Sequence, residues 1–182
     1  MRLTRLEDVK RVYLSLGSNI EPESYLAGGL RSLERVFGHL TLSPVYRNPA
    51  VGFIGDDFLN LVVGLDTALE PTAIAGHCRA IEHAHGRRRD VPKFSSRTLD
   101  IDVLTYGDAV LQIGNLALPR DEIVRYAFVL KPLADIAADE HYPCTGETYQ
   151  ALWTRMQAAW GHPPLTRLAV DLHQSSTVSG HD

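Results

Sequence analysis

A strand pattern and a pair of acids coincide in one stretch of the chain, Arg97-Thr98-Leu99-Asp100-Ile101-Asp102. Side chains alternate between the two faces of a strand, so Leu99 and Ile101 point one way while the two aspartates point the other. Two like charges on one face repel each other unless a positive group neutralises them. Because Mg²⁺ prefers carboxylate oxygens together with substrate phosphates, the pair predicts a two-metal phosphoryl-transfer site. An isolated D-x-D pattern is more often a strand with one solvated face, so the flanking sequence has to support the site.

Positive charge precedes the aspartates. Residues 87–89 are three successive arginines, Lys93 follows them, and Arg97 stands three residues before Asp100. The planar guanidinium group of arginine matches the oxygens of a phosphate. A basic run is also typical of a solvated loop. Its position directly before the paired aspartates favours a phosphate-binding role.

Length and composition describe a single globular domain. The chain has 182 residues, which suits one domain; we place it at residues 1–164, with residues 165–182 as a disordered C-terminal tail. Hydrophobic residues make up 45% and charged residues 22%, as in ordinary soluble proteins. A formal net charge of −4 argues against binding to duplex nucleic acid, which needs a basic face.

The cysteines and the hydropathy indicate the cellular compartment of the protein. Cys78 and Cys144 are the only cysteines, and they form no C-x-x-C motif, which is typical of thiols in a reducing compartment. No stretch has the length of an apolar membrane span. We therefore expect a cytoplasmic monomer that binds small molecules and neither nucleic acid nor membranes.

Hydrophobic periodicity gives the order of the elements. We expect helices at residues 24–37, 71–85, 132–138 and 147–160, with Asn19 or Ser24 capping the first. We expect strands at residues 12–16, 40–47, 58–66, 97–107, 109–111 and 128–130, with a hairpin turn at Gly107-Asp108. Helices alternate with strands, but hairpins interrupt the alternation. That favours an α+β fold, a ferredoxin-like α-β-α sandwich with a mainly antiparallel sheet, over a doubly wound parallel sheet.

A second group of residues indicates a flat heterocyclic ligand. Phe58 and Asn60 share one face of the strand predicted at residues 58–66, and Phe128 follows later in the chain. Aromatic rings are more often core residues, but a ring and an amide on one face provide stacking and donor–acceptor pairing. The chain has neither G-x-x-x-x-G-K-[ST] nor G-x-G-x-x-G, so any nucleotide would be held without a P-loop or a Rossmann turn.

With these motifs in this order, the chain resembles the 6-hydroxymethyl-7,8-dihydropterin pyrophosphokinase family of folate biosynthesis. The resemblance runs from about Val12 to Trp153. It rests on Leu16-Gly17-Ser18-Asn19, Tyr46-Arg47-Asn48-Pro49, Phe58-Leu59-Asn60, Ile81-Glu82, Gly86-Arg87, residues 97–102 and Phe128-Val129-Leu130-Lys131-Pro132-Leu133. It implies the ferredoxin-like fold and transfer of diphosphate from ATP to the pterin hydroxymethyl group, with release of AMP.

The resemblance also implies roles for particular residues. Asp100 and Asp102 would hold two Mg²⁺ that bridge the ATP phosphates, and Arg87 and Arg97 would stabilise charge in the transition state. ATP binding would use Glu82, Arg87, Arg89, Arg97, Arg120 and Tyr126. Pterin binding would use Asn48, Pro49, Val51, Phe58, Asn60, Phe94 and Phe128. Asp102 is a candidate acceptor for the hydroxyl proton, although a metal-bound carboxylate is a weak base.

Three departures from the family pattern leave alternatives open. Phe94-Ser95-Ser96 stand where the family usually has Trp, Gly and Pro, Arg120 stands where it has His, and Tyr126 stands where it has Arg. A second hypothesis is therefore a non-catalytic or altered-specificity pterin- or nucleotide-binding paralogue. A third is another two-metal enzyme on a ferredoxin-like sheet, such as a polymerase palm or a nucleotidyl cyclase. The acidic balance and the aromatic–amide group argue against the third.

Overall fold

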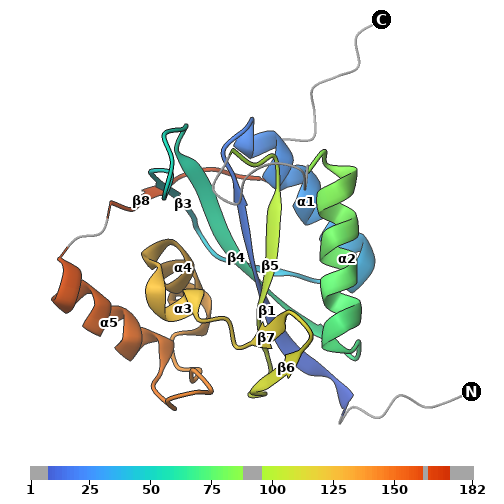
Figure 1. The fold of residues 1–182 in the computed structure, drawn as a ribbon, viewed down its shortest axis with the longest axis vertical. Coiled ribbons are helices and arrows are strands. Elements are labelled where there is room, and N and C mark those ends of the chain that lie inside the picture. The colour runs from blue at the N-terminus through green and yellow to red at the C-terminus, as the bar shows by residue number, and fades with distance from the viewer. Residues whose placement is uncertain (1–7, 88–95, 162–163, 173–182) are drawn as a thin grey trace, which may run out of the picture.

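The structure, a computed structural model, describes residues 8–87, 96–161 and 164–172 (Figure 1). The main sheet contains β1 (Lys10–Ser18), β2 (Thr41–Leu42), β3 (Val45–Asn48), β4 (Phe58–Thr67), β5 (Asp100–Tyr106) and β8 (Thr166–Leu168). A separate hairpin contains β6 (Leu111–Ile113) and β7 (Leu116–Leu118). The helices are α1 (Pro22–Phe37), α2 (Pro71–Ala84), α3 (Glu122–Arg125), α4 (Ala127–Ala137) and α5 (Tyr149–Trp160).

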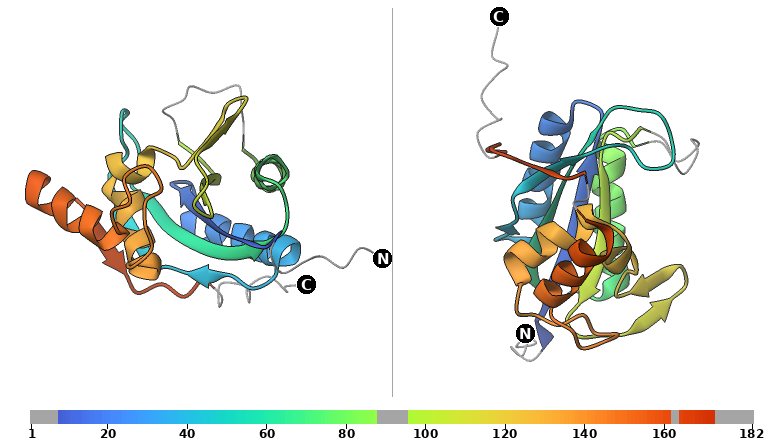
Figure 2. Two further views of the ribbon diagram at one scale, coloured as in Figure 1. Left: turned by 90° about the horizontal axis from the view of Figure 1, so that it is seen from below. Right: turned by 90° about the vertical axis from the view of Figure 1, so that its left-hand side faces the viewer.

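The main sheet lies between two layers of helices (Figures 1 and 2). Its strand order is β5-β1-β4-β3-β8, with β2 also paired to β4, and each of these pairings is antiparallel. Helices α1 and α2 cover one face, and α4 and α5 lie on the other. The β1-α1-β3-β4-α2-β5 portion has the order of a ferredoxin-like fold. The expected α-β-α sandwich is confirmed.

Strand β1 divides the hydrophobic core into two parts. Val12, Leu14 and Leu16 are at most 1% exposed and pack into the core beneath α1 and α2. Tyr13, one residue out of phase, packs into the second core with α4 and α5. Because side chains alternate along this central strand, β1 contributes buried residues to the core on each face of the sheet.

The first two helices follow their predicted periodicity. Leu26, Leu30 and Leu33 form one buried face of α1, which begins two residues earlier than expected and ends before Gly38 at a positive φ of 79°. The predicted cap at Asn19 or Ser24 is wrong, because Glu21 occupies the cap position. Asn19 instead connects loops, as described below.

One predicted strand is wrong: residues 128–130 belong to helix α4. Leu130, Leu133, Ala134 and Ala137 recur at helical spacing and are all buried. Packing of this face against β3 and β4 outweighs the local β propensity of Phe-Val-Leu. The helix predicted at residues 132–138 is the second half of α4, with Pro132 inside it.

Two other strand predictions need correction. The strand expected at residues 40–47 is interrupted at Ser43-Pro44, because proline has no N–H for the ladder. The Ser43 side-chain oxygen there accepts a hydrogen bond from the Val62 backbone N–H at 2.8 Å. The chain does turn at Gly107, but β6 pairs with β7 rather than returning along β5.

The expectation of a disordered tail from residue 165 is wrong for the first part of that segment. Strand β8 pairs antiparallel with β3, and Leu172 is 5% exposed within the main core. The edge strand therefore extends the sheet beyond residue 164; residues 173–182 lie outside the described residues. Throughout the described ranges, the helices are too short or too polar to cross a membrane.

Candidate active site

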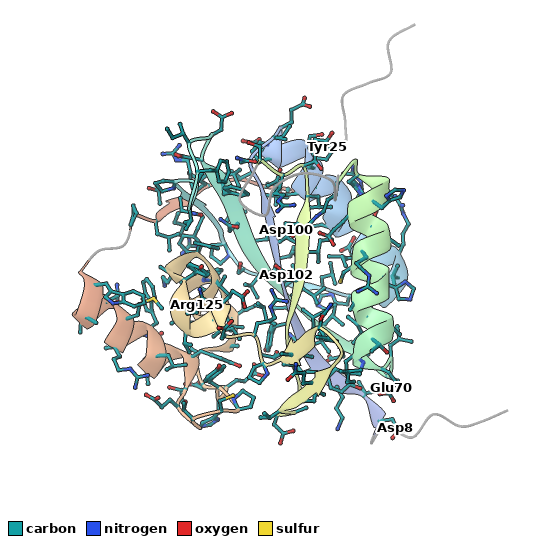
Figure 3. The ribbon with its side chains drawn as sticks, viewed as in Figure 1. Asp8, Tyr25, Glu70, Asp100, Asp102 and Arg125 are labelled. Atoms are coloured by element: carbon teal, nitrogen blue, oxygen red, sulfur yellow. The ribbon has the colours of Figure 1, made fainter. Side chains whose placement is uncertain are left out.

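The two aspartates begin strand β5 and point away from the core (Figure 3). Ile101 and Val103 on the opposite face are 3% and 4% exposed, so the predicted alternation is confirmed. In the β1–β5 register, Gly17 is opposite Asp100 and Ser15 is opposite Asp102. These small neighbours leave the space above the carboxylates open.

Each aspartate has an arginine beside it. Arg87, just after α2, forms ion pairs with Asp100 and with the buried Glu82. Arg120 Nη2 lies 3.8 Å from Asp102 Oδ1 and 2.9 Å from Glu122 Oε1. In these ion pairs among the described residues, four carboxylates contact two guanidinium groups.

Burial and neighbouring negative charge raise the pKa values of two carboxyl groups. Burial, followed by repulsion from Asp100, raises the pKa of Glu82 to about 7. Burial and the Asp100 charge also raise the pKa of Asp102 to about 6. A site of oxygen donors that destabilises its own negative charge fits a hard divalent cation. Across the described residues, no group of three or more His, Cys, Asp and Glu side chains could hold a metal ion.

A cavity of about 340 Å³ opens in front of the carboxylates. Asn48, Val51, Phe58, Asn60 and Phe128 line it together with both aspartates, Arg87, Arg97 and Arg120. The structure thus brings most of the predicted pterin residues into one cavity with Arg87, Arg97, Arg120 and the aspartates; we call it the ring cavity. Its volume suits a small ligand.

The polar floor of the ring cavity is an amide pair. Asn60 is 8% exposed and donates through its side-chain nitrogen to the Asn48 side-chain oxygen. Asn48 in turn donates to the Pro49 carbonyl oxygen at 3.0 Å, whereas Pro49 does not line the cavity. Phe58 forms the adjacent wall, and Phe53 packs edge-to-face against it with ring centroids 6.3 Å apart.

A second cavity of about 430 Å³ adjoins the same charges. It lies between α2, β5 and the β6–β7 hairpin, and it shares Arg87, Asp102 and Arg120 with the ring cavity. Its other walls include Thr72, Arg79, Glu82, Asn115 and Leu116. Of these wall residues, only Glu82 was predicted from the sequence. Arg79 and Asn115 carry no local signal, because they come together only when the hairpin folds beside β5.

Asn19 is a positioning residue that the sequence analysis missed. Its side-chain oxygen accepts from the Arg97 backbone N–H at 2.7 Å, and its own N–H donates to the Arg97 carbonyl at 3.1 Å. Its side-chain nitrogen donates to the Asp56 carbonyl at 3.1 Å. Asn19 therefore connects the loop after β1 with two segments that border the ring cavity.

Four predicted site residues remain, of which Arg120 and Tyr126 are described by the structure. Arg120 lies at the carboxylates and lines both cavities, whereas Tyr126 lines the ring cavity and does not line the second one. Arg89 and Phe94 lie outside the described residues. Paired aspartates with flanking arginines between two cavities are typical of phosphoryl-transfer enzymes that bring two substrates together.

Comparison with known proteins identifies the family. A family model described as 7,8-dihydro-6-hydroxymethylpterin-pyrophosphokinase (HPPK) matches residues 13–138. A 2-amino-4-hydroxy-6-hydroxymethyldihydropteridine pyrophosphokinase of Pseudomonas aeruginosa is 37% identical over 139 residues, covering 74% of this chain and 85% of its own. A protein of the same description from Methylorubrum extorquens is 41% identical over 133 residues, covering 71% and 84%. The chain belongs to the HPPK family.

Solved structures agree on the fold. Plasmodium falciparum HPPK-DHPS, wild type, superposes with a TM-score of 0.66 at 13% identity and covers 87% of this chain. Its complex with pteroate gives the same TM-score and covers 82%. The chain spans 48% and 43% of the length of those two solved chains. At this identity the likeness establishes the fold alone.

Proposed function

We propose that this chain transfers diphosphate from ATP to the hydroxymethyl group of 6-hydroxymethyl-7,8-dihydropterin and releases AMP. The observation that carries the proposal is the meeting of two cavities at one charged cluster, since Arg87, Asp102 and Arg120 line both. The family membership supports the reaction. Transfer of diphosphate requires the two substrates to meet, and a junction of two cavities allows this.

The ring cavity is the proposed pterin site. Phe58 and Phe128 supply aromatic faces, and Asn60 supplies an amide for the ring edge. Because Asn60 and Asn48 are buried and paired with each other, their amide groups are held in fixed positions before a ligand arrives. Val51 and Asn48 add the loop side of the cavity. Phe94 is assigned to this site from the resemblance only.

The second cavity is the proposed nucleoside site. It leads away from the charged cluster toward polar groups on α2 and the hairpin, including Arg79 and Asn115. The triphosphate would then lie across Arg87, Arg97 and Arg120, whose guanidinium groups match phosphate oxygens. Glu82 keeps Arg87 at the junction through their ion pair.

Catalysis by the chain consists of positioning and charge neutralisation. A bond forms between the hydroxymethyl oxygen and the β-phosphorus of ATP. The bond from that phosphorus to the oxygen bridging it to the α-phosphorus breaks, so AMP leaves and the hydroxyl proton is released. Asp100 and Asp102 would hold two Mg²⁺, whose chemistry is to orient and neutralise the phosphate oxygens. Arg87 and Arg97 stabilise the charge that moves onto the leaving AMP.

The test is an assay of AMP formation from ATP and Mg²⁺, with and without the reduced pterin. We expect AMP only when all three are present, together with the diphosphorylated pterin. Tight binding of the pterin without any AMP would instead support the binding-paralogue alternative. That the chain acts as a monomer in the cytoplasm stays a prediction.

A further inference from the structure

Tyr126 packs against Phe128, a residue of the proposed pterin site. The resemblance assigned this position to ATP, but Tyr126 lines the ring cavity with Phe128. The two rings are stacked, with centroids 5.0 Å apart and an angle of 18° between their planes. Tyr126 therefore covers one face of Phe128.

The backbone holds the Tyr126 ring in this place. Its N–H donates to the Glu122 carbonyl at 3.0 Å, and its carbonyl accepts from the Val129 and Leu130 N–H groups at 3.1 and 3.0 Å. Tyr126 is thus fixed at the junction of α3 and α4, two residues before Phe128. The position of its ring follows from the way these helices join.

Arg125 covers the Tyr126 ring and is itself anchored. Its guanidinium carbon lies 5.3 Å from the Tyr126 ring centroid, and its Nη2 donates to the Tyr126 hydroxyl at 3.4 Å. Arg125 Nη1 also pairs with Asp121 at 3.2 Å. Figure 3 shows Arg125 on α3, at the side of the site that lies across from the β5 carboxylates. Arg125, Tyr126 and Phe128 therefore form one stack along the cavity wall.

We propose that Tyr126 is a positioning residue for the pterin: it holds Phe128 as the stacking platform of the ring cavity. The proposal rests on the proposed function. An arginine at this position would carry a charge toward the phosphates, whereas a phenol is a neutral donor and acceptor. Arg120 supplies positive charge at the carboxylates instead, 3.8 Å from Asp102. Of the two departures, Arg120 places a charge beside Asp102, and Tyr126 places a neutral ring against Phe128.

The experiment compares Tyr126→Ala with Tyr126→Phe in the full chain. Pterin affinity is measured by fluorescence titration with 6-hydroxymethyl-7,8-dihydropterin, and the KM values for pterin and ATP are measured in the AMP assay. We expect Tyr126→Ala to weaken pterin binding roughly 3- to 10-fold, the scale of one lost aromatic pair. The KM for ATP should change less than about 2-fold, because an aromatic pair on the pterin wall does not contact the nucleotide. Tyr126→Phe should restore pterin affinity, since it keeps the ring.

Two further variants complete the test. Tyr126→Leu preserves apolar volume if the alanine variant does not fold, and the same loss of pterin affinity is expected because the stacked ring is gone. Trp160→Ala is the matched control, an exposed aromatic residue at the end of α5 that lines neither cavity; it should leave each constant unchanged.

Two results would overturn the proposal: a raised KM for ATP with unchanged pterin affinity, or no change in either constant. Failure of the proposed function looks different, because then neither the wild-type chain nor any variant would form AMP. The direct pterin titration would still report on Tyr126 in that case.

Discussion

At the scale of single residues, the site contains carboxylates that are buried close to one another. Asp100, Asp102 and the buried Glu82 lie close enough to raise the pKa values of two of them. Arg87 and Arg120 offset part of that repulsion. The consequence is a cluster that is electrostatically strained until further positive charge arrives, which suits it to a reaction that begins with cation and phosphate binding.

Substitution of the aspartates separates catalysis from stability. We expect Asp100→Asn and Asp102→Asn each to lower kcat at least about 1000-fold, because an amide cannot replace the charge of a metal-binding carboxylate. Thermal denaturation should show an unchanged or slightly higher Tm, since each change removes like-charge repulsion. Asp139→Asn, at an exposed position after α4, is the control and should retain wild-type activity. Full activity in either site variant would contradict the assignment.

The buried Glu82 gives a pH dependence with a defined sign. Its pKa rises from 4.5 to about 7 on folding, so the folded chain binds the proton more tightly than the unfolded chain does. Its contribution to the free energy of unfolding is therefore present below pH 4.5 and is lost as the pH rises through about 7. We expect a loss on the order of 1–3 kcal/mol in protein free of divalent cations.

Glu82→Gln isolates that contribution. Urea unfolding at several pH values should show the variant gaining stability relative to wild type as the pH rises from about 5 to about 8. Glu34→Gln, at an exposed position on α1, serves as the control and should follow the wild type. A constant difference between Glu82→Gln and wild type across this interval would refute the pKa shift.

At the scale of elements, the site depends on how closely β1 approaches β4 and β5. Gly17 lies between Asn60 on β4 and Asp100 on β5 in the sheet register. A Cβ atom at Gly17 would come within 2.6 Å of the Asn60 side-chain oxygen. The glycine therefore allows the amide floor of the ring cavity to sit directly beside the carboxylates.

Gly17→Ala should affect binding as well as stability. We expect a loss of about 1–3 kcal/mol in the free energy of unfolding from overpacking, and a higher KM for the pterin because Asn60 must shift. Gly76→Ala is the matched control: nothing lies within 4 Å of a Cβ there, and the position is inside α2. Alanine should stabilise that helix by about 0.5–1 kcal/mol. An unchanged pterin KM in Gly17→Ala would mean that Asn60 does not contact the ring.

The predictions of helices and strands were right where one face of the element is apolar. They were wrong where tertiary packing decides which element forms. Helices α1 and α2 and strands β1, β4 and β5 carry clear periodicities, and all were predicted with small errors at their ends. Residues 128–130 have strand-forming side chains, yet they form the start of α4. The helical spacing that begins at Leu130 extends beyond that short window and is satisfied only against the sheet.

At the scale of the whole molecule, the core extends to residue 172. Leu172 is 5% exposed and packs into the core under α1 and α2, although it lies in the segment expected to be disordered. Strand β8 before it protects the β3 edge of the sheet through antiparallel pairing. The stability of the fold therefore includes residues after the last helix.

A substitution in that segment measures its contribution. We expect Leu172→Ala to lower the free energy of unfolding by about 2–4 kcal/mol, the usual cost of truncating a buried leucine. Val110→Ala provides the control, because Val110 is 65% exposed, and should cost less than about 0.5 kcal/mol. Chemical denaturation gives both values. Equal, small effects would show that Leu172 is not part of the core.

The sequence by itself determined the fold class, the β5 aspartates, the neighbouring arginines and the aromatic–amide group, because alternation along a strand and the chemistry of side chains are local properties. Only the tertiary structure decided how these groups combine. The second cavity, the Asn19 links, the β8 strand and the stacking of Tyr126 on Phe128 join segments that are distant in the chain or that turn sharply between helices. Local periodicity cannot encode such contacts, since they are fixed by the packing of whole helices and hairpins on the sheet.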